Sequence, residues 1–157
     1  MKRDRPGKSE QIPTMVNEAA YRRTRLQVNP LPCVFQSALL AQHAQCKLAQ
    51  KKSLAEREGL SCSQPSAHLN CELLEQLLLE RATFALQLHP KAPMTHAKVM
   101  KLQCGGLLGM REVMDAPQAD VHALLVLAQE RYGSLRELPW SPIVQSIAHW
   151  QVRRRAP

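Results

Sequence analysis

Residues 62–88 read CSQPSAHLNCELLEQLLLERATFALQL, and we expect the rest of the chain to be organised around this stretch. From Ser66 onward, its apolar residues recur with the 3.6-residue period of an α-helix. One broad arc of that helix collects the apolar side chains Cys71, Leu73, Leu74, Leu77, Leu78, Phe84, Ala85 and Leu88. The opposite side collects the polar side chains Glu72, Gln76, Glu80, Thr83 and Gln87. An apolar arc this wide indicates burial against more than one neighbour, which predicts the central helix of a bundle.

The composition points to the same class of fold. Of the 157 residues, 45% are apolar and only 4% are aromatic, so the core must be built from aliphatic side chains. Such a core favours helices packed on helices. Because the chain lacks alternating runs of Val, Ile and Thr, we predict no strand. We therefore predict an all-α fold, a single-domain helical bundle of about five helices over residues 29–152.

Capping and breaking residues set the expected ends of the other helices. We expect these helices over residues 33–58, 95–114 and 117–132, and from residue 141 onward. Asp115 with Gln118 is predicted to cap the helix that ends before Gly133. Gly105-Gly106 lies inside another, where each glycine costs about 1 kcal/mol relative to alanine. That cost indicates a helix break, a close helix crossing or room for a ligand.

The formal charge of +8 is concentrated at the two ends of the chain. Residues 1–26 hold seven bases and three acids, a net +4, and residues 153–157 add three arginines. We predict a disordered basic arm over residues 1–28, with a short helix at 15–26 as an option, and a basic tail over 153–157. The arginines predicted to contact nucleic acid or an acidic protein partner are Arg22, Arg23, Arg25, Arg153, Arg154 and Arg155. The alternative is that both ends are merely solvated.

No apolar run is long enough to span a membrane, and no apolar segment follows the charged start as it would in a signal peptide. We therefore expect a cytoplasmic protein whose thiols stay reduced. Its five cysteines are an odd number, which argues against a closed disulfide framework.

The cysteines are the main candidates for a binding site: Cys33, Cys46, Cys62, Cys71 and Cys104. Thiolate ligands are typical of iron–sulfur clusters and of zinc. Because no C-x2-C pair occurs, the pattern favours a site that gathers single cysteines from several helices over a zinc ribbon or a ferredoxin. A straight helix over residues 33–58 prevents all five thiols from meeting, so a site of three or four requires a bend in that helix or the return of Cys104. The alternative is that each thiol packs in the core as a small apolar side chain.

Two H-x-x-C pairs add a second metal pattern. His43 lies one helical turn before Cys46, and His68 lies one turn before Cys71. Adjacent helices could combine the two pairs into a zinc site with two histidines and two cysteines. The alternative is coincidence in a chain with six histidines.

Arg81 falls in the middle of the apolar arc of the central helix. A buried guanidinium needs a compensating partner. We expect either a buried ion pair with a carboxylate of a neighbouring helix or a role against an anionic ligand or cluster. A third arrangement extends the side chain to the edge of the bundle.

The chain carries no nucleophile elbow, phosphate-binding loop or dinucleotide fingerprint, so we name no catalytic residue and an enzyme is the least favoured interpretation. The leading interpretation is a small cysteine-ligated metal-binding protein that acts in electron transfer, sensing or cluster handling, with an iron–sulfur cluster favoured over zinc. The alternative is a metal-free helical adaptor or regulatory module that binds nucleic acid or an acidic protein through its basic ends.

Overall fold

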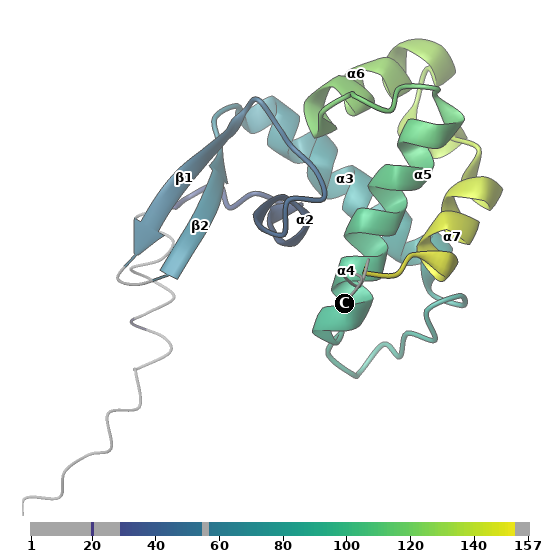
Figure 1. Cartoon of the computed structure of the whole chain (residues 1–157), viewed down its shortest axis with the longest axis horizontal. Coiled ribbons are helices and arrows are strands. Elements are labelled where there is room, and N and C mark those ends of the chain that lie inside the picture. The colour runs from purple at the N-terminus through teal and green to yellow at the C-terminus, as the bar shows by residue number, and fades with distance from the viewer. Residues whose placement is uncertain (1–19, 21–28, 55–56, 153–157) are drawn as a thin grey trace, which may run out of the picture.

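A computed structural model describes residues 20, 29–54 and 57–152, and it combines a helical body with one β-hairpin (Figure 1). The helices are α2 (Gln36–Leu40), α3 (Pro65–Ala82), α4 (His96–Met100), the π-helix η1 (Lys101–Gly105), α5 (Gly106–Val113), α6 (Val121–Tyr132), the 3-10 turn η2 (Leu135–Glu137) and α7 (Trp140–His149). The hairpin consists of β1 (Ala49–Leu54) and β2 (Arg57–Cys62). Within these described ranges, no helix has both the length and the apolar character that a membrane span requires.

The helical body is built around α3. Leu74, Leu77 and Leu78 of this helix are fully buried, which confirms the side that the periodicity assigned to the core. They belong to one core cluster with residues of the later helices, including Leu107, Met110, Leu124, Ile143 and Ile147. In Figure 1, α5 and α7 lie side by side in front of α3, and the hairpin projects to one side of the helices.

The central helix begins and ends earlier than its pattern predicts. Pro65 occupies the first turn, with Gln64 in place of Ser66 as the N-cap, and the helix stops at Ala82. Leu88 still packs against the core from the following loop, but Phe84 is 96% exposed. The apolar arc is therefore correct only as far as the helix continues.

The prediction of an all-α fold is wrong, because residues 49–62 form an antiparallel hairpin where a helix over 33–58 was expected. The ladder runs from Ala49 opposite Cys62 to Leu54 opposite Arg57. This stretch is rich in Ala, Gln, Lys, Glu and Leu, which favour a helix locally. Tertiary pairing overrides that preference, since residues 31–33 bond to the outer edge of β2.

The glycine pair lies within a continuous helical stretch. Thr95 caps α4 as predicted, and the chain then runs from α4 through η1 into α5. A Cβ added at Gly105 would lie 2.7 Å from the Cα of Ile147, so α7 crosses too closely for any side chain there. Of the three reasons that the sequence offered for the glycines, the structure shows the close helix crossing.

The start of α6 differs from its predicted capping box. Asp120, rather than Asp115, is the N-cap, and its Oδ1 accepts a hydrogen bond from the backbone N–H of Ala123 at 2.8 Å. Gly133 ends the helix as predicted, with a φ of 75° that favours glycine. The second oxygen of Asp120 reaches the loop before β1, which connects α6 to the candidate site.

Candidate functional site

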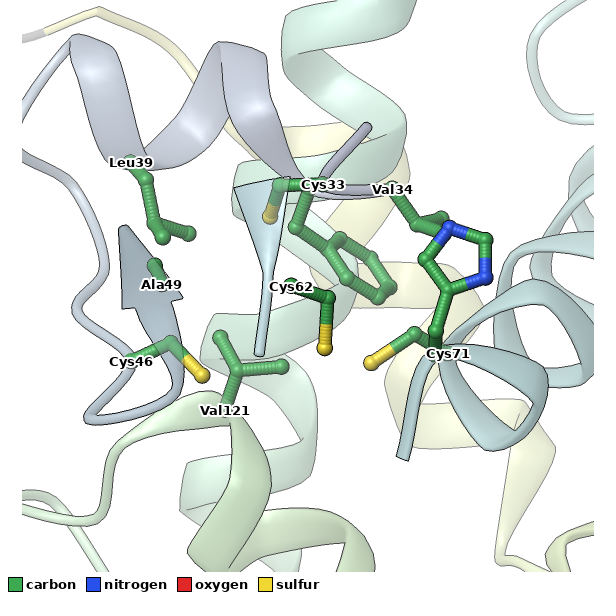
Figure 2. Close-up of a pocket in the computed structure, with 10 residues that line it drawn as sticks. Cys33, Val34, Leu39, Cys46, Ala49, Cys62, Cys71 and Val121 are labelled. Atoms are coloured by element: carbon green, nitrogen blue, oxygen red, sulfur yellow. The ribbon is translucent and has the colours of Figure 1, made fainter. Parts of the chain in front are cut away.

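Four of the five cysteines line one small cavity between the hairpin and the helical body (Figure 2). Cys33 precedes α2, Cys46 lies in the loop before β1, Cys62 ends β2 and Cys71 lies on α3. Figure 2 shows the sulfurs of Cys62 and Cys71 pointing toward one another. The remaining walls are the ring of His68 and the apolar side chains of Val34, Phe35, Leu39, Ala49 and Val121. The cavity has a volume of about 20 Å³, which is room for about one water molecule.

Backbone hydrogen bonds hold Cys33 and Cys62 in register. The N–H of Cys33 donates to the carbonyl of Leu60 at 2.9 Å, and the N–H of Cys62 donates to the carbonyl of Leu31 at 2.8 Å. These two bonds flank an isolated antiparallel bridge between Pro32 and Ser61, so residues 31–33 lie beside β2. The β-ladder thus brings together two thiols that are 29 positions apart in the chain.

The Cys46 loop is anchored by the N-terminus of α6. The N–H of Lys47 donates to Asp120 Oδ2 at 2.8 Å, and the N–H of Val121 donates to the carbonyl of Gln45 at 2.9 Å. Both bonds flank Cys46 in sequence. They fold the chain back after α2, which is the bend that a shared cysteine site requires.

His68 lines the cavity, but both of its ring nitrogens face other groups. Nε2 donates to the carbonyl of Pro32 at 2.9 Å, while Nδ1 lies 3.5 Å from Glu72 Oε1. The side chain therefore fastens the Cys33 segment to α3. His43 lies elsewhere, with its ring edge-on to Trp150 at 5.2 Å between centroids. The structure does not bring the two H-x-x-C pairs together as a site with two histidines and two cysteines.

Burial makes the two deepest cavity thiols weak acids. It raises the pKa of the Cys33 thiol to about 11, opposed by the N–H of Phe35 and reinforced by neighbouring thiols. It raises the pKa of Cys71 to about 12, and the other three cavity thiols contribute in the same direction. Both are therefore protonated at neutral pH in the protein alone. Because the thiolate is the nucleophile, this environment argues against Cys33 or Cys71 as a nucleophile.

Cys62 also makes a hydrogen bond beside the cavity. Its Sγ donates to the carbonyl of Gln64 at 3.2 Å. A bound cation would favour the thiolate forms of Cys33 and Cys71, since it supplies a positive charge that offsets both burial and the repulsion among thiolates.

Cys104 is separate from the other four. It is buried in η1 and does not line the cavity, and burial raises its pKa to about 11 against the lowering effect of Arg111. All five cysteines are free thiols. In the part of the chain that the structure describes, no group of three or more His, Cys, Asp or Glu side chains is arranged to hold a metal ion.

The expectation of a buried Arg81 is wrong. Its side chain is exposed, and its Cζ lies 5.7 Å from the centroid of the Trp140 ring. Arg81 lies in the last turn of α3 beside the buried Ala82, but its long side chain extends over the Trp140 ring and reaches solvent. The third arrangement, extension to the edge of the bundle, is the one observed. Arg81 therefore serves neither as a buried ion pair nor as a ligand of the cavity.

The predicted contacts of the basic ends cannot be placed in the fold. They lie outside the residues that the structure describes: Arg22, Arg23, Arg25, Arg153, Arg154 and Arg155. The predicted arm over residues 1–28, apart from Ala20, and the tail over 153–157 lie outside them too.

Sequence reasoning missed the elements that gather the thiols. Asp120 was overlooked because Asp115 with Gln118 offered a capping box nearby, and its second role with Lys47 spans 73 positions. His68 was considered as a ligand, whereas it bonds to Pro32.

Comparisons of the chain with protein-family models, with curated proteins and with solved structures find no match.

Proposed function

We propose that this protein binds an iron–sulfur cluster through Cys33, Cys46, Cys62 and Cys71. The observation that carries the proposal is the convergence of four thiols, from four separate segments, on one apolar cavity. Four thiols around one cavity provide the soft ligands that an iron–sulfur cluster requires, whereas packing as small apolar side chains does not require the thiols to share one cavity.

The donor set fits a cluster better than it fits a single ion. A cluster distributes its ligands around several iron and sulfide atoms, so its cysteines need not converge on one point. Zinc instead requires four sulfurs about 2.3 Å from one centre, and no described group has such an arrangement. The cavity is smaller than a cluster, so binding must widen it. The Cys46 loop, residues 41–48, lies outside the helices and strands, and we place that movement there.

A cluster in this site would carry or sense electrons. Its reduction potential would depend on hydrogen bonds to the sulfurs and on exposure to solvent. The chain supplies the N–H of Phe35 beside Cys33 and a lining of mostly apolar side chains. We therefore place the protein in electron transfer, redox sensing or cluster handling. A reducing compartment such as the cytoplasm suits five free thiols.

Single cysteine-to-alanine variants test the proposal. Each variant and the wild type are purified without oxygen and incubated with iron, sulfide and a reductant, and bound iron is then measured by absorbance and metal analysis. Replacement of any one of Cys33, Cys46, Cys62 and Cys71 should lower bound iron sharply. Cys104→Ala is the matched control, because it removes an equally small buried thiol outside the cavity. Equal iron loss in the Cys104 variant, or full retention in the other four, would contradict the proposal.

The charge distribution favours a second role, in which the basic ends contact an anionic partner surface on a protein or a nucleic acid. Such contacts should weaken steeply with salt. Binding of the full chain to a DNA duplex is measured against salt concentration. The same measurement on a variant with Arg153, Arg154 and Arg155 replaced by alanine should show weaker binding. Salt-independent binding, or binding unchanged in the variant, would contradict this role for the tail.

A further inference from the structure

Gln103 makes two long-range hydrogen bonds from the interior of the helical body. Its Oε1 accepts from the N–H of Ala38 at 3.1 Å, and its Nε2 donates to the carbonyl of Val34 at 3.0 Å. The residue is only 5% exposed, so these bonds satisfy a buried amide that would otherwise be costly. Both partners lie in the segment that immediately follows Cys33.

Residues 34–38, which bond to Gln103, in turn position two of the candidate ligands, Cys33 and Cys62. The backbone N–H of Phe35, between Val34 and Ala38, opposes the rise in pKa that burial causes at the adjacent Cys33 thiol, and so lies beside it. Gln36 of the same segment accepts from the N–H of Leu60 at 2.8 Å through its side-chain Oε1. Leu60 lies on β2, two residues before Cys62. A displacement of residues 34–38 would therefore move Cys33 directly and Cys62 through the strand.

The π-helical turn explains how Gln103 reaches this segment. Gln103 lies within η1, where i to i+5 hydrogen bonds insert one extra residue into the helix. One extra residue rotates everything after it by about 100° relative to a regular α-helix. The same helix can then direct Gln103 toward α2 and Gly105 and Gly109 against α7. π-Turns are locally unfavourable and occur frequently at functional sites.

We propose that Gln103 is a positioning residue for the thiol site, which it serves by fixing the segment that carries Cys33 and that bonds to the strand of Cys62. The functional role of Gln103 rests on the proposed iron–sulfur function. Its effect on the position of Cys33 rests on the geometry of the protein alone. Outer partners of metal ligands typically change metal affinity by about 10–100-fold when they are replaced.

The test compares two replacements of Gln103 with a packing control. Gln103→Met keeps the length of the side chain and removes both hydrogen bonds, whereas Gln103→Glu keeps an acceptor for Ala38 and loses the donor to Val34. Leu102→Val is the control, because Leu102 is fully buried in the same turn and its shortening lowers stability by packing alone. Urea unfolding first ranks the variants by stability.

Two measurements then separate positioning from general stability. In the iron-loaded protein, Gln103→Met should transfer iron to a chelator about tenfold or more faster than Leu102→Val. In the metal-free protein, mass spectrometry should show faster alkylation of Cys33 in Gln103→Met than in Leu102→Val, with Gln103→Glu between them. If Gln103→Met does not fold, Gln103→Glu takes its place in both comparisons.

The outcomes distinguish the two proposals. If alkylation of Cys33 and iron release in the Gln103 variants follow stability alone, as in Leu102→Val, the positioning role is overturned. If the wild type binds no iron, the proposed function fails, and the alkylation of Cys33 still decides whether Gln103 positions that thiol.

Discussion

Gly105→Ala should destabilise the protein by about 2 kcal/mol, although alanine is the better helix former. The change in helix propensity alone would stabilise the helix by about 1 kcal/mol. Against this gain, the new Cβ would lie 2.7 Å from the Cα of Ile147 and 3.0 Å from the carbonyl oxygen of Ser146. Carbon atoms in contact prefer about 3.7 Å, so α7 must move away by about 1 Å.

The size of the loss follows from which atoms obstruct the new methyl group. Both belong to the backbone of α7, so neither can rotate aside as the end of a side chain could. Overpacking of this kind costs about 1–3 kcal/mol and occasionally more. The same displacement would loosen Ile143 and Ile147, which are fully buried. An overpacking cost of about 3 kcal/mol, minus the helical gain of about 1 kcal/mol, gives the predicted net loss of about 2 kcal/mol.

Urea unfolding followed by circular dichroism measures this loss, with Gly106→Ala as the matched control. That variant has a similar helical gain, but its new Cβ meets the end of the Leu78 side chain, at 2.9 Å from Cδ2. Its free energy of unfolding should stay within about 1 kcal/mol of the wild type. A Gly105→Ala protein as stable as the wild type and as Gly106→Ala would refute the close crossing of η1 and α7.

Two further predictions concern the surroundings of the cavity. The metal-free protein should lose stability as the pH rises above about 9, because the unfolded Cys71 thiol ionises near 9.0 while the folded one keeps its proton to about 12. Urea unfolding at about pH 8 and about pH 10.5 measures this loss of stability, which Cys71→Ala should reduce. Asp120→Ala should lower stability by about 1–2 kcal/mol and speed amide exchange at Lys47, whereas Asp120→Asn should do less of both. Stability that is flat or rising with pH, or unchanged exchange at Lys47, would contradict the respective prediction.

The parts of the fold that the sequence predicts are those with a local cause. Leu74, Leu77 and Leu78 repeat with the helical period, so one face of α3 could be assigned to the core. Gly133 ends α6 because its positive φ is a local requirement. In each case the deciding interaction lies within a few positions of the residue that signals it.

The hairpin has no such local cause. Residues 49–62 favour a helix by composition, and their pairing depends on bonds from residues 31–36. The candidate site also depends on the formation of this hairpin in place of a long helix. A straight helix over 33–58 would separate Cys33 from Cys46 by about 20 Å, whereas a helix that ends at Leu40 lets the chain return. The sequence therefore shows which cysteines are candidate ligands, but it does not show that four of them meet at one cavity.

The exposed position of Arg81 could not be predicted from the sequence for a different reason. Its helical phase does point toward the core, but phase alone does not show which way a long side chain extends. The guanidinium of Arg81 extends over the Trp140 ring and reaches solvent, although the neighbouring Ala82 is buried.

The iron, acid-labile sulfide and zinc content of the wild-type chain of 157 residues, purified without oxygen, tests the proposed thiol site most directly. The account predicts bound iron and sulfide in equal amounts, with a broad visible absorption that is lost when the iron is removed. Zinc bound to a colourless protein would replace the cluster with a single ion. A protein that holds neither iron nor sulfide, even after anaerobic incubation with both, would contradict the account.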